Sequence, residues 1–164
     1  MSSFDRRTCL IGAGAFALGG CGFAPAYGPG GGAARLDNAV LVDAPDTRGG
    51  YQLTRHLEDR LGRAAEPRYG LSYQIRLKEA PIAISSDNVT LRFNILGEIT
   101  YALRDLSTEA VLTKGKVDSF SSYSASGTSV ATQASRLDAE ARLITILGDQ
   151  IITRLAVAAP AFPA

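Results

Sequence analysis

Several residue types that often carry chemistry are scarce in this 164-residue chain. It contains no tryptophan, a single histidine (His56) and two cysteines, Cys9 and Cys21. Because Cys9 lies inside a predicted removable signal and Cys21 at its end, the mature part has no thiol left for a disulfide or a metal cluster. We therefore expect no metal site and no cofactor, and a fold that is stabilised by its core alone.

The chain also lacks an excess of charge of either sign. Its formal net charge is +1, and Asp5, Arg6 and Arg7 in the predicted signal account for that one charge. A general nucleic-acid-binding domain is normally strongly basic, so the composition argues against nucleic acid as a partner. A site for a polyanion would have to come from cations gathered on one face of the protein.

Catalytic motifs are missing as well. There is no Gly-x-Ser-x-Gly motif. The chain has no second histidine that could form a catalytic or metal-binding pair with His56, and no base lies near Ser126-Gly127 in the sequence. His56 lies beside a predicted apolar helix stripe, where a surface or boundary histidine is the ordinary case. The sequence predicts that the protein is not an enzyme and has no catalytic residues.

The N-terminus has the order of a secretory signal. Arg6 and Arg7 form a positive n-region, and the apolar run 9–18 that follows is too short to cross a bilayer as a stable helix. The signal ends in LGGC at 18–21, which resembles the bacterial lipobox, where the cysteine sulfur is acylated and the chain is cut before it. We predict a signal peptide at 1–20 and a membrane anchor through lipid on Cys21.

The segment after Cys21 predicts where the domain sits. Residues 21–36 are mostly glycine, alanine and proline and predict a flexible tether, followed by one domain at 37–160. Gly22 stands where some bacteria place an aspartate that retains lipoproteins in the inner membrane, so we expect the outer membrane, facing the periplasm. The arginine pair leaves open whether export is by the general or the twin-arginine route.

Hydrophobic spacing predicts a strand and a helix in the first half of the domain. The apolar run 39–42 is typical of a short strand. Leucines recur every four residues over 53–61 and predict a helix that follows Gly49-Gly50 and ends before Pro67.

Alternation then predicts an antiparallel meander with one buried face. Apolar residues occupy the odd positions of 71–77 and 91–103, and a weaker third strand follows at 111–120. Between the first two, a break is expected at Pro81 and at 85–88. A serine-rich loop is predicted at 121–129, and a helix from 130 to about 159. The fold class is therefore α+β, with two helices packed on one face of a four-stranded, mostly antiparallel sheet in the order β-α-β-β-β-α.

Together with the lipobox, these stretches resemble the LptE family of lipopolysaccharide-assembly lipoproteins. The resemblance runs through CGFAPAYG at 21–28, residues 51–61, 92–105, and 122–155. It implies a non-enzymatic subunit that plugs the large outer-membrane barrel LptD, helps that barrel fold, and takes part in inserting lipopolysaccharide into the outer leaflet. Only Cys21 carries over residue by residue, as the lipidated cysteine. A stand-alone periplasmic lipid-binding or chaperone-like lipoprotein remains an alternative.

The meander also gathers cations on the side away from its apolar face. Only Glu98 and Asp118 oppose them there, so this side is suited to lipid A phosphates or to an acidic barrel wall. An ordinary solvated sheet face remains an open alternative, because charged outward positions are usual in half-buried sheets. The candidate ligand-binding residues are Arg76, Lys78, Arg92, Lys114 and Lys116, with Arg104 on the same side.

Overall fold

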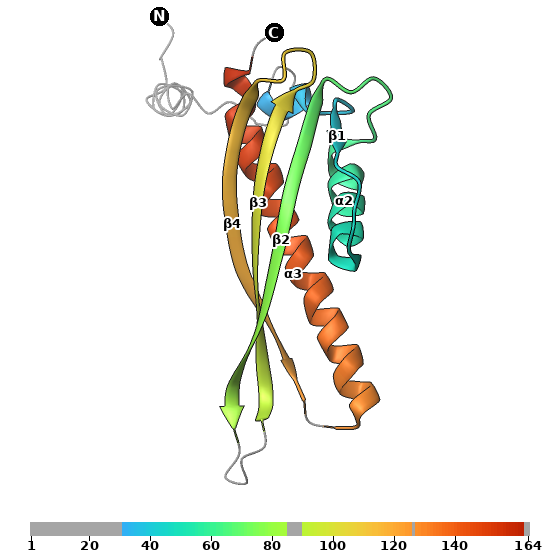
Figure 1. Ribbon diagram of the computed structural model, residues 1–164, viewed down its shortest axis with the longest axis vertical. Helices are drawn as coiled ribbons and strands as arrows, with labels where there is room; N and C mark the ends of the chain where they lie inside the picture. Colours follow the sequence, from blue (N-terminus) through green and yellow to red (C-terminus); the bar gives the residue numbers. More distant parts are fainter. Residues whose placement is uncertain (1–30, 85–89, 126, 163–164) are drawn as a thin grey trace, which may run out of the picture.

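The computed structural model describes residues 31–84, 90–125 and 127–162. Within them a four-stranded sheet has the order β1-β2-β3-β4, and two long helices lie on one of its faces (Figure 1). The predicted α+β architecture is confirmed. The predicted signal, Cys21, the break expected at 85–88 and Ser126 lie outside the described residues.

The sheet is mixed but mostly antiparallel. Strand β1 (Val40–Val42) runs parallel to β2 (Tyr69–Ile84), whereas β3 (Thr90–Asp105) and β4 (Val111–Ser124) continue as an antiparallel meander. Odd residues of β3 face the helices, and Ile95, Ile99 and Leu103 among them are almost fully buried. The predicted alternation therefore assigned the buried face correctly.

The break expected at Pro81 does not occur. Strand β2 continues through Pro81, which pairs with Phe93, and the register shifts only beyond it. The backbone groups of Tyr69 and Leu71 form hydrogen bonds toward the β1 side. Because backbone groups alternate in direction along a strand, the backbone nitrogen of Pro81 points to that same edge of β2. Strand β1 has already ended at this point, so no strand pairs with the edge there. A proline at such a position removes no bond of the ladder and is tolerated in a strand.

The serine-rich loop predicted at 121–129 is also shorter than expected. Strand β4 runs to Ser124 because Tyr123 is buried and its ring stacks on Phe93 of β3, with centroids 5.4 Å apart. Tyr123 is buried, whereas the serines on either side of it are half-buried or exposed. This alternation is that of a strand, even though serine by itself favours turns.

Helix α2 (Arg48–Leu61) starts one turn earlier than predicted, with Gly49 and Gly50 in its first turn. The Thr47 hydroxyl caps it by accepting a hydrogen bond from the Gly50 amide at 3.0 Å. Its leucine stripe (Leu53, Leu57 and Leu61) is buried, as the spacing predicted, and the helix ends before Pro67 at Gly62. Gly62 has φ 77°, a conformation that favours glycine.

Helix α3 (Ser129–Ala158) is the long C-terminal helix that the sequence predicted. By length and composition it could cross a membrane, but half of its most apolar window is buried inside the protein. It packs on the sheet and on α2, where Gly148 allows a close approach and His56 Nε2 lies 2.9 Å from Asp149 Oδ1. Its buried residues are Ala139, Leu143, Ile144, Leu147, Gly148, Ile151, Ile152, Leu155 and Ala156.

Two short 3-10 helices close the core at one end of the sheet. Helix η1 (Gly32–Arg35) is followed by the fully buried Leu36, and η2 (Ala159–Ala161) is followed by the buried Phe162. Arg35 Nη1 donates a hydrogen bond to the Phe162 carbonyl at 2.8 Å. The chain enters and leaves the fold at this end, which we call the anchored end because Cys21, the predicted site of the lipid anchor, precedes η1 in the sequence.

Candidate functional site

The face of the sheet opposite the helices forms one continuous surface, which we call the open face. It consists of the even-numbered residues of β3, of β2 up to the register shift that follows Pro81, and of β4 up to the register shift near Thr113. Neighbouring side chains therefore form cross-strand rows. From the anchored end outward, the rows are Ser72-Ala102-Lys114, Gln74-Thr100-Lys116, Arg76-Glu98-Asp118, Lys78-Leu96-Phe120 and Ala80-Asn94-Ser122.

The structure places all six cations singled out from the sequence on this open face, and all six are exposed. Glu98 and Asp118 share the face with them, so cations exceed carboxylates there even though the whole chain is almost neutral. The two carboxylates on this face are therefore too few to neutralise its six cations. The six are Arg76, Lys78, Arg92, Arg104, Lys114 and Lys116.

Glu98 engages two of these cations. Lys116 Nζ donates to Glu98 Oε2 at 2.7 Å, and Arg76 Nη1 lies 3.8 Å from Glu98 Oε1. The hydrogen bond from Lys116 lowers the pKa of Glu98 and, reciprocally, raises that of Lys116. Such exposed ion pairs contribute little to stability. Among the described residues, the other four cations form no ion pair and remain available to an external anion.

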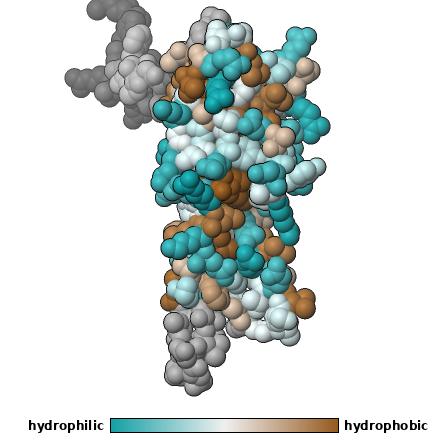
Figure 2. Space-filling view, viewed as in Figure 1, coloured by the Kyte–Doolittle hydropathy of each residue, from teal (hydrophilic) through white to brown (hydrophobic). Residues whose placement is uncertain are grey.

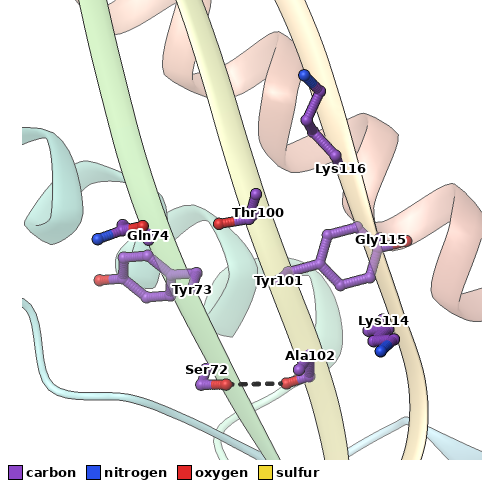
Figure 3. Close-up of a pocket in the computed structure, with 9 residues that line it drawn as sticks. All are labelled: Ser72, Tyr73, Gln74, Thr100, Tyr101, Ala102, Lys114, Gly115 and Lys116. Atoms are coloured by element: carbon purple, nitrogen blue, oxygen red, sulfur yellow. Dashed lines mark hydrogen bonds between the residues drawn. The ribbon is translucent and has the colours of Figure 1, made fainter.

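The Ser72-Ala102-Lys114 and Gln74-Thr100-Lys116 rows enclose a shallow depression of about 650 Å³ (Figure 3). Its floor is made of small and hydroxylated side chains from β2 and β3, and Lys114 and Lys116 stand along its β4 side. The Ser72 hydroxyl already donates to the Ala102 carbonyl at 3.3 Å, whereas the Lys114 ammonium forms no ion pair with another described residue. The arrangement can bind an oxygen-rich, negatively charged group such as a phosphorylated sugar.

The five candidate residues do not converge on one pocket. Lys114 and Lys116 line the depression, but Arg76, Lys78 and Arg92 lie progressively further from the anchored end. Ala102, level with Lys114, and Arg92 are ten residues apart along β3, which is about 33 Å. The open face is therefore a basic strip suited to an extended partner or to several anionic groups.

Sequence reasoning missed the apolar part of this strip. Leu96 and Phe120 are cross-strand neighbours on the open face, and their side chains are 44% and 61% exposed. Figure 2 shows apolar surface midway along this side of the molecule, bordered by polar side chains. The available signal was an apolar residue at an even position in each strand, where the alternation calls for a polar one.

Comparison with known proteins identifies the family. The family model for LptE, lipopolysaccharide-assembly, matches residues 38–155. The chain belongs to the LptE family. No curated protein matches its sequence. Its family is a non-enzymatic family of lipopolysaccharide-assembly lipoproteins.

Solved structures of lipoproteins share the LptE-like fold. A putative lipoprotein from Caulobacter crescentus matches with TM-score 0.66 and 22% identity, covering 80% of this chain and 98% of its own. Rare lipoprotein B from Shewanella oneidensis matches with TM-score 0.58 and 13% identity, covering 73% and 92%. A minor lipoprotein from Acinetobacter baumannii gives TM-score 0.52 and 13% identity, covering 73% and 89%. At these identities the likeness concerns the fold alone.

Proposed function

We propose that this LptE-family chain is an outer-membrane lipoprotein, acylated at Cys21, that acts as plug and assembly partner of an LptD-type barrel. In this role it takes part in lipopolysaccharide transport and insertion into the outer leaflet. The family assignment supports the process, and the lipobox at 18–21 supports the anchor. The observation that carries the barrel and ligand role is the open face.

The open face has the properties of a surface that meets a partner. The sheet has a helical layer on one side only (Figure 1), and the other side is a long strip of cations, hydroxyls and two apolar side chains. Of the six cations, four form no ion pair within the described chain. An anionic partner would supply the missing charge without disturbing an existing ion pair.

Two anionic partners within the same function fit this strip. The phosphates of lipid A would occupy one part of it, whereas an acidic barrel wall would run along its length. The spread of the cations, from Lys114 to Arg92, favours contact with the wall along the strip. The depression beside Lys114 suits a phosphorylated sugar. Both contacts are electrostatic and should weaken as salt screens them.

The alternative of a stand-alone lipid carrier has less support. A carrier that shields acyl chains needs an enclosed apolar cavity. The depression beside Lys114 is open to solvent and lies on the polar side of the sheet. The interior beneath the sheet is filled by the leucines and isoleucines of the core.

Affinity purification of the native lipoprotein from detergent-solubilised outer membrane tests the proposal. We expect a large β-barrel protein to be recovered with it in a fixed ratio. Recovery of the lipoprotein alone, with lipid bound, would support the carrier instead.

Mass spectrometry of the mature protein tests the anchor separately. The expected N-terminal residue is an acylated Cys21, with no peptide from 1–20. Cys21→Ser should release the protein from the membrane and leave its stability unchanged, because the core begins at Leu36. An unmodified Cys21 in the native host would overturn this part of the proposal.

A further inference from the structure

A second apolar feature lies at the anchored end of the open face. One cross-strand row there spans all four strands and joins Leu41 of β1, Gly70 of β2, Arg104 of β3 and Val111 of β4. Leu41 and Val111 are 50% and 51% exposed. A row that should carry polar side chains on a solvated face thus has aliphatic groups at both ends.

Leu106 completes this patch from the turn between β3 and β4. Its side chain lies over Gly70, so close that a Cβ on Gly70 would come within 2.9 Å of Leu106 Cδ2. The glycine therefore makes room for a leucine that is itself 41% exposed. Leu41, Leu106 and Val111, from three different elements, form what we call the end patch.

The end patch lies close to the membrane anchor. Figure 1 shows η1 and the β3–β4 turn at the same end of the molecule. Cys21 is ten residues before Gly31, the first described residue, so the connection can span at most about 35 Å. A lipid on Cys21 keeps this end within that distance of the leaflet, whereas the far end of the sheet has no such constraint.

Charge around the end patch is nearly balanced, unlike the basic strip next to it. Arg104 and Arg68 lie among Asp43, Asp105 and Glu109, and the buried Asp105 is held by hydrogen bonds from Ser107. Hydrogen bonds from Ser107 keep the pKa of the Asp105 carboxyl below its usual range. A partner here is selected by apolar contact and not by net charge.

We propose that the end patch contacts the phospholipid leaflet that holds the anchor. This inference rests on the proposed acylation of Cys21. Exposed aliphatic side chains beside arginines, whose stems are apolar and whose heads reach phosphates, suit the interface of a bilayer. The contact orients the domain, so that the open face points in a fixed direction relative to the membrane.

A fluorophore placed on the patch tests the contact directly. Because the sequence has no cysteine after Cys21, Val111→Cys adds a single labelling site to the lipidated protein. Phe120→Cys is the matched control, since it lies on the same strand and face and is 61% exposed. In vesicles of phosphatidylethanolamine and phosphatidylglycerol, an environment-sensitive label at 111 should shift to the blue and be quenched by spin-labelled lipid. The label at 120 should do neither.

A partition experiment without the anchor gives an independent readout. In the mature chain carrying Cys21→Ser, adding Leu41→Gln and Val111→Thr should weaken binding to the same vesicles about tenfold, as expected for removing two partly buried aliphatic groups. Leu96→Gln with Phe120→Thr should leave binding unchanged. Both measurements are made at high salt, which screens any attraction between the basic strip and phosphatidylglycerol and leaves the apolar contact of the end patch.

The outcomes separate this inference from the proposed function. The vesicles contain neither barrel nor lipopolysaccharide. A blue shift of the label at 111 would therefore support the membrane contact even if the proposed role in lipopolysaccharide transport were wrong. Identical spectra at 111 and 120, or equal partition of the two double variants, would overturn the inference. A label at 111 that is shielded only when the barrel is added would also overturn it, in favour of a barrel contact.

Discussion

The two halves of this elongated molecule are stabilised in different ways. In the anchored half both helices cover the sheet, and the interior is apolar. In the far half, beyond about residue 77 of β2, only the first turns of α3 lie near the sheet (Figure 1), and Leu77 on the helix-facing side is 41% exposed. The apolar odd positions of β2 continue through Leu77, and Glu79 and Pro81 follow them. The difference shows that burial depends on how far the covering helix extends.

A polar cluster occupies the helix-facing side of the far half. The Tyr123 hydroxyl donates to Glu79, and Arg136 of α3 lies 3.2 Å from both Glu79 and Glu140. The Arg136 Nε contact is an ion pair without hydrogen-bond alignment. Burial of Tyr123, together with its hydrogen bond to Glu79, raises the pKa of the Tyr123 hydroxyl to about 12. Charged and hydrogen-bonded groups thus join α3 to the sheet where apolar contacts are few.

The largest predicted effect comes from truncating the same type of side chain in each half. Ile99→Ala removes a fully buried group and should lower the free energy of unfolding by about 2–5 kcal/mol. Leu77→Ala, on the same face one row further out, should cost under about 1 kcal/mol because its side chain is already partly solvated. Urea titration of both variants measures this. Equal costs would show that the far half is packed as tightly as the anchored half.

A smaller effect is expected at the polar cluster. Tyr123→Phe should cost about 1–2 kcal/mol through loss of the hydrogen bond to Glu79. Because folding raises the pKa of this hydroxyl from 10.0 to about 12, its stabilising contribution is complete below pH 10 and is lost as pH rises toward 12.

The difference in stability between wild type and Tyr123→Phe should therefore shrink across that window. Unfolding titrations at several alkaline pH values provide the measurement. A constant difference from pH 9 to 12 would mean that Tyr123 does not hold its proton more tightly in the folded state.

A still smaller effect is predicted for the proline in β2. Pro81→Ala should change stability by less than about 0.5 kcal/mol, because residue 81 faces the unpaired edge of the strand. Ala80→Pro is the contrasting variant, since residue 80 faces β3 and the substitution removes a bond of the ladder. Thermal melts of the two variants should differ clearly. Similar melting temperatures would refute the assignment of edges in β2.

Much of the fold was predictable because alternation and helical spacing are set by residues close in sequence. Ile95, Ile99 and Leu103 of β3 and the leucine stripe of α2 are buried as the pattern required. The errors concern long-range contacts. Whether Leu77 is covered depends on the length of α2, and whether residues 121–124 form a strand depends on the stack of Tyr123 on Phe93. No local pattern contains that information.

The candidate site was predictable to the same degree. The even residue numbers of the six cations placed them on one face, because side chains alternate between the two faces along a strand. This alternation gave neither the pairing of Lys116 with Glu98 nor the neighbouring positions of Leu96 and Phe120, because both depend on the register between strands. The depression beside Lys114 likewise exists only once three strands are aligned.

The central claim is that the open face, in both halves, is the surface that meets an anionic partner. Arg92→Glu with Lys114→Glu tests it most directly, with one substitution in each half. The control is Arg55→Glu with Arg60→Glu on α2, which changes the net charge equally on another side of the molecule. Neither pair should alter thermal stability, because exposed charges contribute little to it.

The decisive measurement is lipopolysaccharide binding and barrel recovery for these two double variants, at low and high salt. The account predicts that the open-face pair loses at least one of the two interactions and that the α2 pair keeps both. Loss of lipopolysaccharide binding alone would identify a phosphate site, and loss of barrel recovery alone a wall contact. If both interactions survive the open-face reversal, the cations form an ordinary solvated face and the claim is wrong.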